Sequence, residues 1–135
     1  MQREERLCRS MKRPPSPKHS VKEKAERVKT REEVLRIAAL ARDGLAKVYG
    51  ERLRGVYLFG SFARGAADED SDIDIAVVLD EVPSRYAEIQ RTGALGSQLS
   101  LDQGALVTFF FVPEADFGAG RYAVYRTIRR EGMPL

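Results

Sequence analysis

Histidine, cysteine and tryptophan are almost absent from this sequence of 135 residues, which limits the chemistry that the chain can perform. Cys8 is the only cysteine, so neither an internal disulfide nor a cysteine metal cluster can form. His19 is the only histidine, and both residues lie in the polar N-terminal stretch. Nucleophilic catalysis by a Ser–His or Cys–His pair is therefore excluded.

Long apolar runs are missing as well. No segment is long enough to span a bilayer, and no signal peptide with an apolar centre opens the chain. We therefore expect a cytoplasmic protein that does not enter a membrane. Hydrophobic residues still make up 43% of the sequence, which is enough for the core of one globular domain.

Basic charge is concentrated near the N-terminus. Residues 1–30 contain ten Lys and Arg against four Asp and Glu, whereas the other 105 residues carry thirteen against sixteen. The first 29 residues have few apolar side chains and a Pro-Pro-Ser-Pro cluster at 14–17, which predicts a disordered basic tail (1–29) before a single domain (30–135). Such a tail could bind nucleic acid or an acidic partner. Because no aromatic residue is present to stack on bases, we favour a solubilising extension.

The most informative segment is residues 60–79, with the sequence GSFARGAADEDSDIDIAVVL. The apolar residues Gly55–Phe59 predict a short strand before it. Across Ile73–Val77 apolar and other residues alternate, which predicts a second strand with Asp72 and Asp74 on the same face. Two carboxylates at this spacing repel each other unless a cation lies between them. Oxygen ligands of this kind suit Mg²⁺, which also binds the phosphates of substrates.

The first half of the same segment predicts an anion-binding turn. Gly60 allows the chain to turn tightly off the first strand, and Ser61 is a favourable N-cap for a short helix at Phe62–Arg64. The N–H groups at the start of that helix and the Ser61 hydroxyl would line a phosphate pocket. Arg64 could add a charged hydrogen-bond donor.

Together these residues resemble a known family signature. Gly-Ser-x-Ala-Arg-Gly at residues 60–65, followed by Ser-Asp-Ile-Asp-Ile at residues 71–75, is similar to the motif of the DNA polymerase β nucleotidyltransferase superfamily. More narrowly, the chain resembles the minimal nucleotidyltransferases that are often encoded beside HEPN-domain proteins. The resemblance runs from about Val56 to Leu79, with a weaker match at Tyr125–Gly132. The alternative, a glycine turn and a polar loop with solvated acids, does not explain two acids at the start of an apolar strand.

The resemblance implies an Mg²⁺-dependent enzyme that moves a nucleotide monophosphate from an NTP, with ATP as the expected substrate, to an acceptor hydroxyl. Asp72 and Asp74 would hold Mg²⁺, Gly60 and Ser61 would cradle the β and γ phosphates, and Arg64 would offset their charge. The acceptor would be a partner protein or RNA. The family's pairing with HEPN-domain proteins suggests a toxin–antitoxin pair in which this chain is the antitoxin.

One part of the family pattern is missing. Active members place a third carboxylate on a later strand, where it helps to hold a second metal ion. The expected register puts that position at Thr108, and residues 104–112 contain no Asp or Glu. Asp102 and Glu114 flank this strand and would reach inward only if its ends bend.

The resemblance implies two Mg²⁺ sites. The site that accompanies the nucleotide is retained, and the other lacks a ligand. This leaves a second interpretation open, in which a degenerate relative binds nucleotide or a HEPN partner without transfer. A third and more distant one is a nucleic-acid-binding module that acts through its tail.

Hydrophobic spacing predicts the remaining elements. A capping box at residues 30–33 begins a helix that extends to about Arg52. Further elements are expected as follows: a helix at Ser84–Leu99, a strand buried on both faces at Ala105–Val112, a loop at Asp116–Gly120 and a helix at Arg121–Arg130. The first of these two helices would bury Tyr86, Ile89, Leu95 and Leu99. The second would bury Tyr122, Tyr125 and Ile128 and end at a left-handed Gly132. This order predicts an α/β fold, and the family resemblance implies a small mixed sheet.

Overall fold

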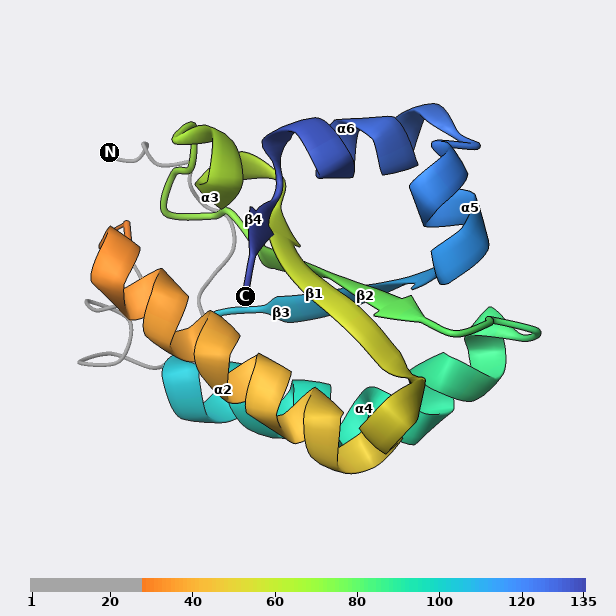
Figure 1. Cartoon of the computed structure of the whole chain (residues 1–135). Coiled ribbons are helices and arrows are strands. Elements are labelled where there is room, and N and C mark those ends of the chain that lie inside the picture. Colours follow the sequence, from red (N-terminus) through yellow and green to blue (C-terminus); the bar gives the residue numbers. More distant parts are fainter. Residues whose placement is uncertain (1–27) are drawn as a thin grey trace, which may run out of the picture.

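The computed structural model describes residues 28–135, so the predicted tail lies outside the described residues up to position 27. In this part of the chain a mixed sheet has the strand order β3-β2-β1-β4 (Figure 1). The strands are β1 (Leu53–Phe59), β2 (Ile73–Leu79), β3 (Val107–Pro113) and β4 (Met133–Pro134). β1 is antiparallel to β2 and β4, whereas β2 and β3 are parallel. The predicted α/β fold with a small mixed sheet is confirmed, although β4 was not predicted.

Helices cover both faces of the sheet. α2 (Arg31–Tyr49) and α4 (Arg85–Gln103) pack on one face, and α5 (Glu114–Ala119) and α6 (Ala123–Glu131) cover the other (Figure 1). α3 (Ser61–Arg64) contacts β1 and β2 at one end of the sheet. No helix within residues 28–135 has the length and apolar character needed to cross a membrane.

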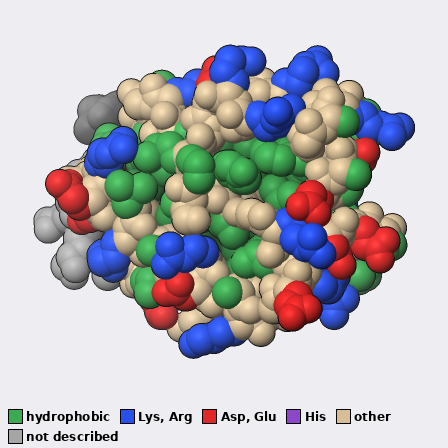
Figure 2. All heavy atoms as spheres, viewed as in Figure 1, with side chains coloured by type: hydrophobic (Ala, Val, Ile, Leu, Met, Phe, Trp, Pro, Cys, Tyr) green, Lys and Arg blue, Asp and Glu red, His purple; other side chains and the backbone are tan. Residues whose placement is uncertain are grey.

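The surface carries basic groups outside the predicted tail. Figure 2 shows Lys and Arg side chains along the edge occupied by α6 and hydrophobic side chains in the hollow between α6 and α2. Arg126, Arg129 and Arg130 of α6 are exposed. The basic character is therefore not confined to the N-terminal stretch, although residues 31–135 carry more acids than bases.

The start of α2 matches its prediction. The Thr30 N–H donates to Oε1 of Glu33 at 2.8 Å, and the Glu33 N–H donates to Oγ1 of Thr30 at 3.1 Å, which is a complete capping box. The helix ends at Tyr49, earlier than predicted, and a 3₁₀ turn (Gly50–Arg52) follows. Because Gly50 has a φ of 56°, which other residues rarely adopt, it ends the helix, and β1 begins at Leu53.

The buried face of α4 differs from the prediction. Tyr86 and Ile89 are 71% and 55% exposed, whereas Leu99 is buried and Leu95 packs against the core. In place of the two exposed residues, α4 buries Glu88, of which only 2% is exposed. The spacing of hydrophobic residues does not predict the buried face of α4, because a charged residue, Glu88, lies at its centre.

Glu88 is stabilised there by three hydrogen-bond donors. Its carboxylate accepts hydrogen bonds from the Tyr49 hydroxyl at 2.8 Å, from Arg91 at 3.1 Å and from Arg52 at 3.2 Å. Arg52 also donates to Asp80 at 3.0 Å. Burial alone would raise the pKa of Glu88, but hydrogen bonds from Tyr49, Arg91 and Arg52 outweigh it and lower the pKa below its usual value. This network joins α2, α4 and the end of β2.

The C-terminal elements also differ from the prediction. The expected loop before Gly120 is mostly the helix α5, and Gly120 ends it in the left-handed conformation. Tyr125 and Ile128 are buried as predicted, but Tyr122 is half exposed at the start of α6. Gly132 is extended and not left-handed, because the chain continues directly into β4.

β3 is less buried than the sequence predicts. β3 is an edge strand, and Thr108, Phe109 and Phe110 remain partly exposed. The central strand is β2, which is buried throughout Ile75–Leu79. The apolar composition of β3 could not show its place in the sheet, because strand order is decided by tertiary packing.

The Glu88 network generates a testable prediction. We expect Glu88→Gln to lower the free energy of unfolding at pH 7 by about 1–3 kcal/mol, because it weakens the charged hydrogen bonds from Arg52 and Arg91, which are themselves partly exposed. Because the native pKa of Glu88 is lowered, its contribution is fully present above the unfolded-state value of about 4.3 and is lost as the pH falls through the native value. Urea denaturation at pH 7 and below pH 4 should show the difference between wild type and variant shrinking in acid.

The exposed neighbour Glu81 provides the control. Glu81→Gln should leave stability almost unchanged at either pH. An equal effect of the two substitutions at pH 7 would contradict a structural role for the network.

Candidate active site

Gly60 connects β1 to α3 with a conformation that other residues rarely adopt. Its φ and ψ are 79° and −153°, and a Cβ atom at this position would overlap Oδ2 of Asp74. The glycine is therefore needed both for the turn and for the close approach of the Asp74 carboxylate. The sequence pattern indicates only the first of these reasons.

Ser61 has a different place from the one predicted. Gly60 is the N-cap of α3, and Ser61 is its first helical residue. Within residues 28–135 no hydrogen bond engages the Ser61 hydroxyl, so it is available to a ligand. The first N–H groups of the helix have no intrahelical acceptors, as at any helix start. Arg64 lies in the same short helix with an exposed side chain, and the structure shows no contact between it and the aspartates.

Asp74 lies between three elements. On β2 it pairs with Phe59 of antiparallel β1 and with Thr108 of parallel β3. The Thr108 hydroxyl donates a hydrogen bond to Oδ1 of Asp74 at 2.8 Å, while Oδ2 faces Gly60. The two carboxylate oxygens thus have different neighbours, one on β3 and the other at the turn before α3.

Asp72 precedes β2 by one residue and is partly buried, as is Asp74. It lines a polar cavity of about 180 Å³ together with Asp68, Asp70 and Ser71 of the preceding loop. Neither Asp72 nor Asp74 forms an ion pair within residues 28–135. Lys29 lines the same cavity without forming an ion pair with Asp72, and it is outnumbered there by acidic side chains.

These oxygen atoms fit a divalent cation of the magnesium type, which prefers carboxylate and phosphate oxygens. Asp72 and Asp74 are the residues that would hold it. In the described part of the chain, however, no three His, Cys, Asp or Glu side chains gather into a metal-binding group. The donor set suits one cation better than two.

The two acids that flank β3 are engaged elsewhere. Asp102 accepts a hydrogen bond from Gln98 on α4 at 2.9 Å. Glu114 follows the far end of β3 and pairs with Arg54 at 3.2 Å. Neither of them contacts Asp74, whereas Thr108 does.

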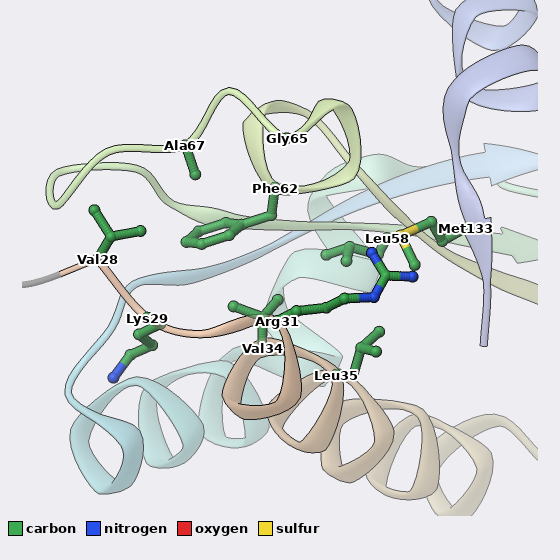
Figure 3. A pocket seen from close by; sticks show the side chains of 10 residues that line it. All are labelled: Val28, Lys29, Arg31, Val34, Leu35, Leu58, Phe62, Gly65, Ala67 and Met133. Atoms are coloured by element: carbon green, nitrogen blue, oxygen red, sulfur yellow. The ribbon is translucent and has the colours of Figure 1, made fainter.

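Phe62 has a role that the sequence did not indicate. Its ring points from α3 toward the start of α2 and lines a pocket of about 220 Å³ together with Val28, Val34 and Leu35 (Figure 3). The side chain packs against the main hydrophobic core. It anchors the short helix, and with it the Gly60 turn, to α2.

The fold and the site define the class of the protein as a nucleotidyltransferase. The family model "Polymerase beta, Nucleotidyltransferase" matches residues 45–109. The chain is 40% identical over 72 residues to the protein adenylyltransferase MntA of Thermococcus cleftensis, covering 53% of this chain and 71% of that protein. It is 32% identical over 76 residues to a candidate protein adenylyltransferase of Methanocaldococcus jannaschii, covering 56% and 76%.

Solved structures agree with this class. A candidate minimal nucleotidyltransferase is 25% identical with a TM-score of 0.54, covering 79% of this chain and 97% of that one. A toxin–antitoxin structure with AMP-PNP, 18% identical with a TM-score of 0.50, shares the fold over 78% of this chain and 72% of that one. The chain belongs to the polymerase β nucleotidyltransferase family.

Substitution of two glycines at opposite ends of α3 tests the geometry. We expect Gly60→Ala to displace the Asp74 carboxylate and to abolish nucleotide binding, measured by calorimetry with ATP and Mg²⁺. Backbone strain and the overlap should also lower the free energy of unfolding by roughly 2–4 kcal/mol.

Gly65→Ala is the matched control, because Gly65 also has a positive φ, 73°, but an added Cβ would meet nothing within 4 Å. It should cost only about 1–2 kcal/mol and leave nucleotide binding intact. Equal loss of binding in both variants would show that strain in α3, and not the approach to Asp74, is responsible.

Proposed function

We propose that this chain transfers a nucleotide monophosphate from an NTP, with ATP as the preferred donor, to a hydroxyl group of a partner protein or RNA. The observation that carries this proposal is the meeting of Asp74 with the Gly60 turn at the end of β1. Ser61 follows that turn as the first residue of α3, and its hydroxyl, which no hydrogen bond engages within residues 28–135, supports a phosphate contact there. The chain's similarity to proteins named as protein adenylyltransferases supports AMP as the transferred group and protein as the acceptor.

The reaction follows from the groups at the site. The acceptor oxygen forms a bond to the α-phosphorus of ATP, and the bond from that phosphorus to the oxygen bridging to the β-phosphate breaks. Pyrophosphate leaves, and the proton of the acceptor hydroxyl passes to solvent. Mg²⁺ held by Asp72 and Asp74 would neutralise charge on the triphosphate. Gly60 and Ser61 would bind the β and γ phosphates, and the exposed Arg64 would approach them when the nucleotide binds.

We further propose that the chain is the antitoxin of a toxin–antitoxin pair whose toxin is a HEPN-domain protein. The similarity to a toxin–antitoxin structure and to MntA supports the pairing, and the family resemblance supports the HEPN identity.

A second candidate is favoured by Thr108. A family member without the third carboxylate could bind Mg²⁺ and ATP and contact its partner without any transfer. The hydrogen bond from Thr108 to Asp74 supports this alternative, because a hydroxyl group stands at the position that register assigns to a carboxylate.

A labelling experiment separates the two. The purified full chain, the HEPN protein encoded beside it and ATP labelled on the α-phosphate should give labelled partner protein in the presence of Mg²⁺. Asp74→Asn, which keeps the shape of the side chain, should abolish labelling. Binding of ATP without any label in protein or RNA would instead establish the non-transferring candidate. In a parallel reaction with ATP labelled on the γ-phosphate, label in protein or RNA would overturn both candidates.

The phosphate contacts can be tested separately. We expect Ser61→Ala to weaken ATP binding by about 1–3 kcal/mol, the cost of losing a hydrogen bond to a charged group. AMP, which lacks the β and γ phosphates, should bind both forms equally. Ser97→Ala, at an exposed position of α4, provides the control in the same calorimetric titrations. Equal loss of AMP and ATP affinity in Ser61→Ala would contradict a contact to the outer phosphates.

A further inference from the structure

Thr108 and Gly60 hold the two oxygens of the Asp74 carboxylate in different surroundings. We propose that this chain holds a single divalent cation with its nucleotide, on the Gly60 side of Asp74, and that Thr108 blocks the place of a second cation. This inference rests on the proposed function, because it concerns the metal centre of the same site. It assigns Thr108 as a positioning residue that sets the number of metal ions.

The direction of the hydrogen bond between Thr108 and Asp74 supports the inference. Asp74 has no proton to donate when it is ionised, so the Thr108 hydroxyl must donate to Oδ1. The distance of 2.8 Å is that of a well-formed bond. This proton occupies the β3 side of the carboxylate, where a cation bridging Asp74 to residue 108 would have to bind. Oδ2, on the opposite side, is left for a cation next to the phosphate turn.

The arrangement of Asp74 between Thr108 and Gly60 is also rigid. Residues 74 and 108 are paired in register on parallel strands, and threonine has few side-chain conformations because it is branched at Cβ. Gly60 limits the movement of Asp74 on the other side, since Oδ2 already occupies the space of a missing Cβ. Rotation of the carboxylate to accept a second cation would disturb both contacts.

The number of carboxylate ligands leads to the same conclusion. Asp72 and Asp74 supply two, and a bound triphosphate would add negative charge but no protein ligand on the β3 side of Asp74. The acids nearest to β3 in the sequence are held by Gln98 and Arg54, away from the site. Asp68, Glu69 and Asp70 line the cavity next to Asp72, but within residues 28–135 no three carboxylates gather into a metal-binding group.

Counting bound Mn²⁺ tests the inference without any measurement of transfer. The full chain, in excess over a non-hydrolysable ATP analogue, is titrated with Mn²⁺, and the free ion is measured by electron paramagnetic resonance. We expect one Mn²⁺ per bound nucleotide for the wild type and two for Thr108→Asp, which restores a carboxylate beside Asp74. Thr108→Val keeps the shape of the side chain without its hydroxyl. It should bind one ion several-fold more weakly, because Asp74 is no longer held.

Each outcome decides the matter. Two ions in the wild type, or a single ion in a folded Thr108→Asp variant, would overturn the inference and leave the proposed transfer intact. A wild type that retains nucleotide but no Mn²⁺ would also overturn it. A wild type that binds neither nucleotide nor Mn²⁺ would overturn the proposed function as well. The wild-type count stands alone if Thr108→Asp does not fold.

Discussion

Asp74 can take its position only because residue 60 has no side chain. The carboxylate lies against the backbone of the turn that leaves β1, and a Cβ atom at Gly60 would occupy the place of Oδ2. On its other side the same carboxylate accepts the hydrogen bond of Thr108. One aspartate thus joins the Gly60 turn, the interior strand β2 and the edge strand β3. The proposed site depends on this contact because the groups proposed to bind metal and phosphate come from separate segments.

The rest of the fold keeps those segments in register. β2 is the central partner of β1 and β3, so the pairing of Asp74 with Phe59 and Thr108 follows from the sheet itself. Phe62 anchors the short helix that follows Gly60 onto the core. At the opposite end of β1 and β2, the buried carboxylate of Glu88 ties α4 to α2 and to Arg52. Buried polar groups of this kind are compatible with stability only when they are hydrogen-bonded, as Glu88 is.

Membership of the polymerase β nucleotidyltransferase family fixes the class of chemistry, but the site differs from the full family pattern at one position. A threonine in place of a carboxylate removes a negative charge, while residues 74 and 108 stay paired on parallel strands. In the proposed site, Asp72, Asp74 and the Gly60 turn would bind the nucleotide and its cation, and Thr108 lies beside Asp74 on the edge strand.

The sequence by itself determined the strands around the motif, the capping box of α2, and the presence of two aspartates on one face, because these depend on local spacing. It also determined which chemistry was excluded. The family resemblance indicated Thr108 as the position beside the Asp pair, and the structure pairs Thr108 with Asp74 on parallel strands. Only the tertiary structure decided that β3 is an edge strand, that Glu88 and not Tyr86 is buried, and that Gly60 touches Asp74. Each of these features depends on contacts between residues that lie more than ten positions apart in the chain. Such contacts leave no periodic pattern in the local sequence.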